Sequence, residues 1–318
     1  MTTRMMATHV EAFLAERRVL GFRTNGPSAS QLRSFARFFD GTDRKGSLTT
    51  ELVVEWAKEH ARTDGPRAWA RRLDALRPFA TYLLREDPAT EFPQTQIFGK
   101  SQRRATPHIY TEEEVLALLA AARHLEPVGG LRPAAYEAFY GLIAATGLRI
   151  SEAIKLRCAD VDLVSRCLTV RMTKFSKSRH VPFHSTTASA LADYLAVRDR
   201  FLPRAAEQSF FVSTPERSLK SRAAHWTFQR LRSKAGIVAR GAYPEVRIHD
   251  FRHTFICRRI QRWRADGADI DNAIAALSTY VGHAKISDTY WYLTGIPDLM
   301  AAAGNRFEDF AFGEKGNG

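Results

Sequence analysis

Three short stretches of this 318-residue chain hold residue types that can act on a phosphodiester. Residues 145–152 read Ala-Thr-Gly-Leu-Arg-Ile-Ser-Glu, residues 249–253 read His-Asp-Phe-Arg-His, and residues 282–292 run from Gly-His to a tyrosine. A guanidinium offers a planar fork of donors that matches two phosphate oxygens, and a tyrosine hydroxyl becomes a nucleophile once its proton is accepted. The combination predicts attack on a phosphodiester without a metal, and hence an enzyme that breaks and rejoins DNA.

The spacing within the first two stretches indicates helices that present these side chains. Ser151 is a candidate N-cap that would hold Arg149 just before a new helix. His249, Arg252 and His253 follow the i, i+3, i+4 pattern, so we expect them to share one polar face of a helix. Taken singly, each match more often arises from a surface arginine or a structural histidine, so only the set carries weight.

The third stretch offers two tyrosines. Ser287 is a candidate cap for a short helix that carries Tyr290, Trp291 and Tyr292. The two tyrosines would lie about 200° apart on that helix, so they cannot both face one site. We expect Trp291 to pack in the core. On residue type alone either tyrosine could be the nucleophile.

A lysine stands at the tip of a predicted β-hairpin. Apolar and polar residues alternate over 168–173, and a second short strand pattern follows at 179–183. Lys174 enters the turn between the two strands, and Lys177 and Arg179 follow it. A basic hairpin tip can enter a DNA groove or reach a leaving group, whereas a lone turn lysine is usually just solvated.

The charge balance indicates a polyanionic partner. Lysine and arginine number 47 against 34 acidic residues, which gives a formal charge of +13. The basic residues are spread along the chain, which favours a broad cationic surface over a disordered basic tail. Nucleic acid is the commonest polyanion for such a protein, although charge alone would also fit a surface that serves only solubility.

The cysteines and the apolar pattern narrow the cellular setting. Cys158, Cys167 and Cys257 have no ligand-like spacing, so they imply neither a disulfide framework nor a zinc site. No apolar run approaches the ~20 residues that span a bilayer, and the N-terminus lacks the features of a signal peptide. We therefore expect a cytoplasmic protein that uses no metal, no cofactor and no membrane.

The chain divides by pattern into two parts joined by a linker. Residues 1–90 show four amphipathic helical patterns and no strand pattern, and we expect Ser28 to cap the second helix. Residues 91–108 are basic, contain prolines and lack periodicity. Residues 109–318 predict mainly helices, with one small antiparallel sheet at 161–185 and only helices after it.

Two helix ends in the second part are predicted from single residues. Thr111 and Glu114 form a capping-box pattern at the start of an apolar-striped segment. A later apolar segment stops at Gly147, and glycine is the residue that most often follows a helix. The helix end at Gly147 would place Arg149 directly after a helix.

The order of these residues resembles the tyrosine recombinase, or phage integrase, family. Residues 145–152 are a close fit to the family's first arginine box, and residues 249–253 fit its second box. The hairpin at 168–183 is similar to the one that carries the family's lysine. The match runs through residues 109–318, and residues 1–90 look like the family's core-binding domain. The resemblance implies that family's catalytic fold for the second part.

The same resemblance selects one tyrosine. The family places its nucleophile nine residues after the histidine of the last box, and that step from His283 reaches Tyr292 instead of Tyr290. Residues 290–293 read Tyr-Trp-Tyr-Leu, which is similar to members encoded by transposons and other mobile elements.

The resemblance implies a role for each residue. Tyr292 would attack the phosphate and hold a 3′-phosphotyrosyl link, while Arg149 and Arg252 would clamp the non-bridging oxygens. His249 would accept the tyrosine proton, a task that Lys174 could share, and Lys174 would protonate the leaving 5′-oxygen. With His283 as a further hydrogen-bond donor to the phosphate, the implied catalytic residues are Arg149, Lys174, His249, Arg252, His283 and Tyr292.

The implied partners are double-stranded DNA and further copies of the chain. We expect a homotetramer on paired recombination sites that associates weakly without DNA and lies on the bacterial nucleoid when bound. The covalent link would conserve the energy of the phosphodiester, so neither ATP nor a divalent ion is needed. The apolar residues at 296–303 and 307–312 would dock either on a neighbouring protomer or on their own domain. The candidate DNA-binding residues are Lys100, Arg103, Arg104, Lys177 and Arg179.

Other functions fit parts of the pattern. Within the family we favour integration, excision or transposition of a mobile element, with a chromosome or plasmid dimer resolvase as the alternative. A type IB topoisomerase uses similar residues, but the short chain and the helical first part favour a recombinase. A catalytically decayed DNA-binding protein would not need the full residue set, and a chromatin-compacting protein would explain only the charge.

Overall fold

The computed structural model of this protein divides into two compact units, residues 1–104 and 105–318. Each unit is described by itself. The structure describes residues 5–22, 24, 26–42, 46–59, 65–93, 97–99, 105–171, 178–202, 208–215 and 217–295.

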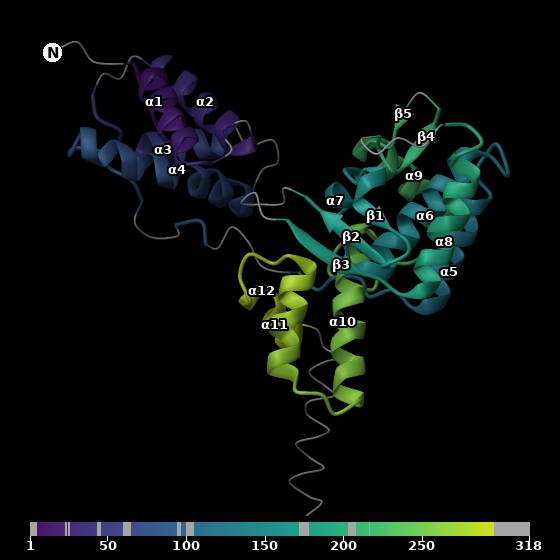
Figure 1. Ribbon diagram of the computed structural model, residues 1–318. Helices are drawn as coiled ribbons and strands as arrows, with labels where there is room; N and C mark the ends of the chain where they lie inside the picture. Colours follow the sequence, from purple (N-terminus) through teal and green to yellow (C-terminus); the bar gives the residue numbers. More distant parts are fainter. Residues whose placement is uncertain are drawn as a thin grey trace, which may run out of the picture. The chain divides into compact units, whose positions relative to one another are not determined.

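The N-terminal unit is a bundle of four helices around one apolar core (Figure 1). Phe35 and Trp56 meet edge to face in this core, with ring centroids 5.4 Å apart, and both are fully buried. The guanidinium of Arg72 lies over the Trp56 ring at 3.8 Å. The predicted helical pattern is confirmed by α1 (Met6–Val19), α2 (Pro27–Asp40), α3 (Thr50–Glu59) and α4 (Pro66–Glu86).

The start of α2 differs from the prediction. The sequence pattern placed the N-cap at Ser28, but α2 begins at Pro27 with Gly26 as its N-cap. Proline suits the first helical position because its φ is already close to the helical value and its missing N–H needs no partner there. The Gly-Pro pair therefore outweighs the serine in starting this helix.

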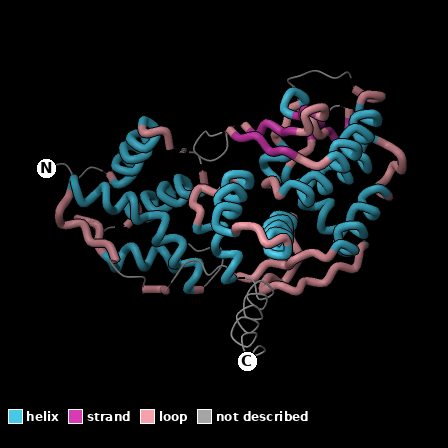
Figure 2. The backbone as a smooth tube through the Cα atoms, turned by 60° about the horizontal axis from the view of Figure 1, so that its bottom comes forward, coloured by secondary structure: helices cyan, strands magenta, loops and turns pink. Residues whose placement is uncertain are grey.

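The C-terminal unit is also mainly helical, and its described residues form two small antiparallel sheets, shown in magenta in Figure 2. Its long helix α6 packs against α5, α8 and α10, with Phe139, Tyr140 and Ile143 buried. In the parts of the chain that the structure describes, no helix has the length and apolar character to cross a membrane. The elements are α5 (Glu112–Arg123), α6 (Leu131–Thr146), α7 (Ile150–Ile154), a 3-10 turn (Cys158–Asp160), β1 (Val161–Asp162), β2 (Cys167–Val170), β3 (Arg179–Pro182), α8 (Ser185–Arg198), β4 (Val212–Thr214), β5 (Arg217–Ser218), α9 (Ser221–Lys234), α10 (His249–Ala265), α11 (Ile270–Val281) and α12 (Ser287–Gly295).

The three-stranded sheet contains the predicted hairpin. Its order is β1-β2-β3, and both strand pairs are antiparallel. Leu168 of β2 pairs with Val181 of β3, and both side chains are completely buried. The two strands predicted at this place are therefore confirmed, although they are shorter than the alternation indicated. Residues 172–177, which include Lys174, lie outside the described residues.

The sequence does not predict the second sheet. β4 and β5 pair antiparallel, so the expectation that only helices follow residue 185 is wrong at this place. β4 has 3 residues and β5 has 2, which is too short for an alternation of apolar and polar residues to be recognised.

Two glycines in the left-handed region end helices beside the predicted chemistry. Gly147 follows α6 with φ 65°, which confirms the predicted stop, and Gly282 follows α11 with φ 69°. Glycine adopts this conformation without the steric cost that a Cβ brings. The chain therefore turns sharply just before Arg149 and just before His283.

Candidate active site

Three arginines from separate parts of the C-terminal unit converge on the C-terminal end of α11. The last carbonyl oxygens of a helix have no partner within the helix, and the helix dipole places partial negative charge there. Arginine suits both features because it is cationic and donates several hydrogen bonds. The carbonyl oxygen of Tyr280 accepts from Nε of Arg179 (2.7 Å), that of Val281 from Nη2 of Arg252 (2.6 Å), and that of Gly282 from Nη2 of Arg149 (2.7 Å).

Glu152 is a carboxylate shared by two of these arginines. Its Oε1 accepts from Nη1 of Arg149 at 2.9 Å, and both of its oxygens accept from the terminal nitrogens of Arg179 at 3.0 and 2.9 Å. Burial alone would raise the pKa of Glu152, but the hydrogen bonds and charges of Arg179 and Arg149 outweigh burial and lower this pKa to about 2. Glu152 is therefore ionised and fixes the two guanidinium groups relative to each other.

Arg149 itself occupies the N-cap position of α7. Its backbone N–H donates to Oε2 of Glu152 at 2.9 Å, while Ser151 lies exposed inside the helix, so the predicted cap at Ser151 is wrong. A glutamate at the third helical position can bond the N-cap backbone whatever the side chain of the cap residue. The Arg149 side chain is 33% exposed, so part of its guanidinium reaches the surface.

Arg179 lies inside the unit, which differs from its expected place in a DNA groove. Its side chain is 11% exposed, and its nitrogens are bonded to Glu152 and to the carbonyl oxygen of Tyr280. A Cβ at position 282 would lie 2.8 Å from Nη1 of Arg179, so Gly282 makes room for this guanidinium. Arg179 thereby connects β3 with α7 and with the end of α11.

Arg252 is buried, whereas the sequence predicts an exposed polar helix face. It is 1% exposed, and its Nη1 donates to the carbonyl oxygen of Gly147 at 2.8 Å. Burial, followed by the nearby charge of Arg149, lowers the pKa of Arg252 from its usual range. Carbonyl oxygens from two helix ends replace the hydrogen bonds of water, which is why an arginine is tolerated here.

Two histidines at the start of α10 lie beside Arg252. The ring centroids of His249 and His253 are 4.8 Å apart in an edge-to-face arrangement. Desolvation by the surrounding protein, followed by nearby positive charges, lowers the pKa of both imidazoles well below the usual range. His249 keeps contact with solvent, and His253 is half-buried. Both are therefore neutral at neutral pH, the state in which a ring nitrogen can accept a hydrogen bond or a proton.

Tyr292 reaches the histidines from α12. Its Oη lies 2.7 Å from Nδ1 of His253, and the residue is 3% exposed. Tyr290 has different surroundings, because its hydroxyl donates to Asp271 on α11 at 3.1 Å. The hydroxyl beside the cluster is thus that of Tyr292, and its hydrogen-bond partner is His253.

His283 packs against the same tyrosine. The imidazole and the Tyr292 ring are nearly parallel, with centroids 6.4 Å apart. Nδ1 of His283 lies 2.7 Å from Oγ1 of the buried Thr289, and this contact fixes the orientation of the imidazole.

Some predicted residues cannot be placed. Lys174, Lys177, Lys100, Arg103 and Arg104 lie outside the described residues. The structure brings together the five other predicted catalytic residues at the ends of α6, α10, α11 and α12: Arg149, His249, Arg252, His283 and Tyr292.

Two further residues of this cluster were not assigned a role from the sequence. His253 is the hydrogen-bond partner of Tyr292, and Glu152 holds two arginines. Their spacing could have indicated them: His253 lies one helical turn after His249, and an acid three residues after Arg149 is the pattern that bonds an N-cap.

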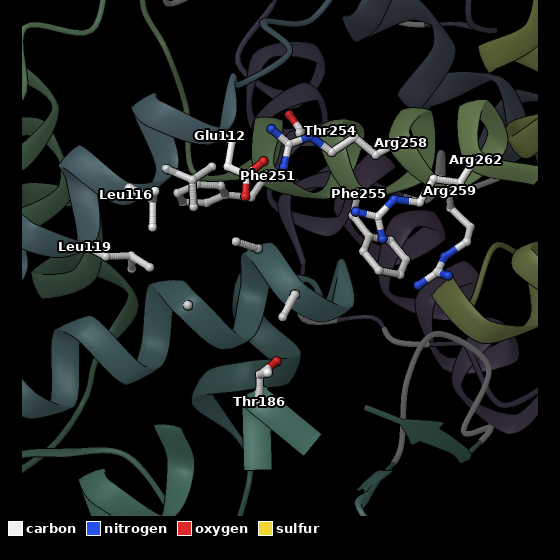
Figure 3. A pocket seen from close by; sticks show the side chains of 14 residues that line it. Glu112, Leu116, Leu119, Thr186, Phe251, Thr254, Phe255, Arg258, Arg259 and Arg262 are labelled. Atoms are coloured by element: carbon white, nitrogen blue, oxygen red, sulfur yellow. The ribbon is translucent and has the colours of Figure 1, made fainter. Parts of the chain in front are cut away.

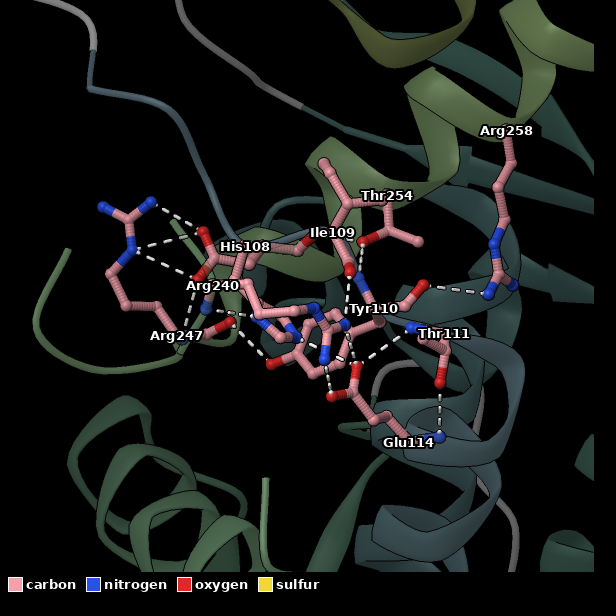
Figure 4. Close-up of polar contacts among 10 residues, drawn as sticks. His108, Ile109, Tyr110, Thr111, Glu114, Arg240, Arg247, Thr254 and Arg258 are labelled. Carbon is pink, nitrogen blue, oxygen red and sulfur yellow. Dashed lines mark hydrogen bonds and ion pairs between the residues drawn. The ribbon is translucent and has the colours of Figure 1, made fainter. Parts of the chain in front are cut away.

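The start of α10 is held by the segment that precedes α5 (Figure 4). The backbone N–H of Tyr110 donates to Oγ1 of Thr254 at 2.9 Å, and its hydroxyl donates to the carbonyl oxygen of Arg247 at 3.1 Å. Arg258 donates to the carbonyl oxygen of Tyr110 at 3.0 Å. Tyr110 therefore fixes the helix that carries two histidines and an arginine of the site.

Glu114 connects the segment before α5 with the loop that contains Arg240 (Figure 4). It forms the predicted capping box with Thr111, with hydrogen bonds of 2.9 and 3.2 Å, which confirms that helix start. Its Oε2 also lies 3.0 Å from Nε2 of His108 and accepts from Nη2 of Arg240 at 2.7 Å.

A hollow of about 420 Å³ lies on another side of α10 and is not part of this cluster. Figure 3 shows side chains of α5 and α10 facing it, among them Leu116, Phe251 and Arg258. Among the described residues, none of the five predicted catalytic side chains lines it. Within the described ranges, no group of three or more histidine, cysteine or acidic side chains could hold a metal ion.

Known proteins match this chain over most of its length. The sequence profile of the phage integrase family matches residues 109–295. A protein of Sinorhizobium fredii (strain NBRC 101917 / NGR234) named integrase/recombinase y4rB is 38% identical over 305 residues, which cover 94% of this chain and 96% of that protein. The chain therefore belongs to the phage integrase family and is an enzyme, a tyrosine-type site-specific recombinase.

Two solved structures share the fold. The Tn1549 transposon integrase in complex with transposon right end DNA superimposes with a TM-score of 0.67 at 15% identity, covering 95% of this chain and 99% of that one. The XerH site-specific recombinase bound to a palindromic difH substrate gives a TM-score of 0.64 at 17% identity, covering 95% and 85%. The fold is thus that of the recombinases XerH and Tn1549 integrase.

Proposed function

We propose that this recombinase cleaves and rejoins double-stranded DNA with Tyr292 as its nucleophile. The tyrosine oxygen attacks the phosphorus, the bond from phosphorus to the 5′-oxygen breaks, and a 3′-phosphotyrosyl link holds the cleaved strand. Attack by the 5′-hydroxyl of another strand then restores a phosphodiester. Because the link conserves the energy of the broken bond, neither ATP nor a metal ion is required.

The arrangement at the end of α11 carries this proposal. Arg149 and Arg252 donate to successive carbonyl oxygens there, and Tyr292 lies in the same cluster. A guanidinium has five N–H donors, so each arginine has donors to offer beyond these bonds. Two preoriented cations beside the nucleophile suit the extra negative charge of a pentacoordinate phosphorus.

The proton transfers are assigned to neighbouring side chains. His249 is held neutral, so it can accept the proton of the tyrosine, and His283 hydrogen-bonds to the phosphate. Lys174 protonates the leaving 5′-oxygen. This assignment is supported by Arg179, which lies five residues further along the chain and donates to Glu152 in the cluster.

The proposed biological role is the integration, excision or transposition of a mobile element. Its support is the relative y4rB, which is named an integrase/recombinase and matches nearly the whole of both chains. The likeness to the Tn1549 transposon integrase concerns the fold alone, and the fold of XerH is about equally similar. A dimer resolvase with the same chemistry is therefore the alternative.

The proposed partners are duplex DNA and three further copies of the chain. A formal charge of +13 supports phosphate contacts as the main source of affinity. Exchange of both strands between two duplexes needs four cleavages, which four protomers supply. The proposed phosphate contacts outside the catalytic cluster are Lys100, Arg103, Arg104 and Lys177.

A nicked DNA substrate tests the chemistry. Cleavage beside the nick releases a short fragment, so rejoining is prevented and the protein–DNA adduct accumulates. The wild type, incubated in EDTA with DNA from the boundaries of its own element, is expected to form an adduct that survives a denaturing gel. Tyr292→Phe should form none, and Tyr290→Phe is the matched control that should form it normally. An adduct that persists in Tyr292→Phe contradicts the proposal.

The mobile-element role needs a separate substrate. Plasmids would carry either the two ends of the element or two directly repeated copies of a single site. Efficient excision and joining of the element ends is the expected result. Recombination restricted to the repeated single site would support the resolvase alternative.

A further inference from the structure

The cluster contains a histidine whose ring contacts the proposed reacting atom. Nδ1 of His253 lies 2.7 Å from Oη of Tyr292, and the two ring centroids are 5.6 Å apart. The rings of Trp291 and His253 are arranged edge to face, with centroids 6.4 Å apart. The distance is that of a strong hydrogen bond, and Tyr292 is almost completely buried at this position.

The neutral state of His253 allows the tyrosine to donate. Desolvation and nearby positive charges lower the pKa of His253 and keep its imidazole neutral. A neutral imidazole has one nitrogen that accepts, and the phenolic O–H is a donor. In the tautomer protonated at Nε2, Tyr292 donates to Nδ1 of His253. The titratable groups that surround His253 are His249, Arg247, Arg252, His283 and Tyr292.

The hydrogen bond has a geometric consequence for attack. Once the O–H of Tyr292 points to His253, the lone pairs of the oxygen point elsewhere, and their direction is set by a rigid helix. His253 is held on α10 one turn from His249 and directly after Arg252. One helix thus carries a partner of the nucleophile and a proposed clamp for the phosphate.

We propose that His253 is a positioning residue that acts on the nucleophile: before attack it accepts the Tyr292 hydrogen bond and thereby orients the oxygen, and during attack the proton passes to His249. This inference rests on the proposal that Tyr292 is the nucleophile. It assigns His253 to the attacking side of the phosphorus, whereas Lys174 belongs to the leaving side. The two sides can be separated by experiment.

The test measures the rate of adduct formation in a single turnover on the nicked substrate. His253→Ala removes the hydrogen bond and is expected to slow adduct formation about tenfold, the effect of one typical hydrogen bond. His253→Asn places an amide oxygen close to the former Nδ1 position and is expected to restore the rate to within about threefold of wild type. His124→Ala, which removes a histidine on the surface, is the control for general effects and should match wild type.

A second substrate identifies the side of the reaction. A 5′-bridging phosphorothiolate has a leaving group that departs without a proton. The defect of Lys174→Ala should be largely relieved on this substrate, and the defect of His253→Ala should persist. DNA affinity and the melting temperature of each variant show whether the protein is folded.

Three results would overturn the inference: a wild-type rate for folded His253→Ala, a rate for His253→Asn as low as that of His253→Ala, or relief of the His253→Ala defect by the phosphorothiolate. Failure of the proposed function is recognised separately, because the wild type would then form no adduct or Tyr292→Phe would still form one. If His253→Ala fails to fold, the decision rests on His253→Asn with both substrates: only a nearly normal rate on each supports the inference.

Discussion

At the scale of single residues, positive charge exceeds negative charge at the end of α11. Arg149, Arg179 and Arg252 meet there, and Glu152 supplies one negative charge to two of them. The cluster therefore keeps a net positive charge that an incoming phosphate can balance. The carbonyl oxygens of α11 stabilise this arrangement because each accepts one hydrogen bond from a guanidinium without cancelling its charge.

Glu152 links the stability of the C-terminal unit to acid pH. Its folded pKa of about 2 lies below the usual 4.5, so its stabilising contribution is complete above about pH 4.5 and is lost as the pH falls toward 2. The contribution is about 3 kcal/mol on the scale of that shift. Chemical unfolding at several pH values should show wild type more stable than Glu152→Gln at pH 7, with the difference shrinking between pH 4.5 and 2. A difference that stays constant over this range would contradict the assignment.

At the scale of elements, the site depends on how helices end. α6 and α11 both stop at left-handed glycines, and these stops bring carbonyl oxygens within reach of arginines from other elements. The hairpin joins this arrangement through Arg179. The helix ends therefore determine the relative positions of the proposed phosphate clamps.

Gly282 tests this idea against a matched control. Gly282→Ala forces a Cβ into the left-handed region and within 2.8 Å of the Arg179 guanidinium, whereas Gly267 has the same φ of 69° and nothing near its missing Cβ. Both substitutions should lower stability by about 1 kcal/mol, because alanine disfavours this conformation. Only Gly282→Ala should slow adduct formation, by about tenfold or more, since it displaces Arg179. Equal activity of the two variants would argue against this role of the α11 end.

The salt dependence of DNA binding by Arg179→Ala shows whether Arg179 is an internal connector or a DNA contact. A residue that neutralises a phosphate adds about one to the slope of log affinity against log salt concentration. The structure predicts that Arg179→Ala leaves this slope unchanged but lowers the melting temperature and the rate of adduct formation. Lys177→Ala is the comparison, for which we expect a slope smaller by about one. A reduced slope for Arg179→Ala would return Arg179 to the DNA-binding surface.

Much of the fold was predictable because long amphipathic helices repeat their pattern over many residues. The four amphipathic patterns of residues 1–90 correspond to α1, α2, α3 and α4, and the Thr111 capping box is present. The caps at Ser28 and Ser151 were wrong because Gly-Pro and a glutamate at the third position compete with a serine. The internal place of Arg179 and the contact of His253 depend on elements far apart in sequence, which periodicity cannot reveal.

At the scale of the whole molecule, the excess of positive charge supports the proposed binding of DNA. The +13 charge is distributed over both units, which suits a protein that must hold a long polyanion. The proposed exchange of strands between two duplexes would bring copies of the chain together on paired sites. The apolar residues at 296–303 and 307–312 are proposed to dock either on a neighbouring protomer or on their own domain.

Removal of residues 303–318 tests this proposed contact. If the tail docks on a neighbouring protomer, the truncated protein should bind a single site with the affinity of wild type but lose cooperative assembly on paired sites. A gel-shift titration with one-site and two-site DNA measures both properties. Unchanged assembly would instead favour a tail that folds back on its own domain.

In the proposed reaction, the hydroxyl oxygen of Tyr292 becomes the covalent link to DNA. The most direct measurement is to digest the wild-type adduct with nuclease and protease and to locate the attached nucleotide by tandem mass spectrometry. We expect a 3′-phosphate ester on Tyr292 and an unmodified Tyr290 in the same peptide. A nucleotide on Tyr290, or on a residue outside α12, would contradict it.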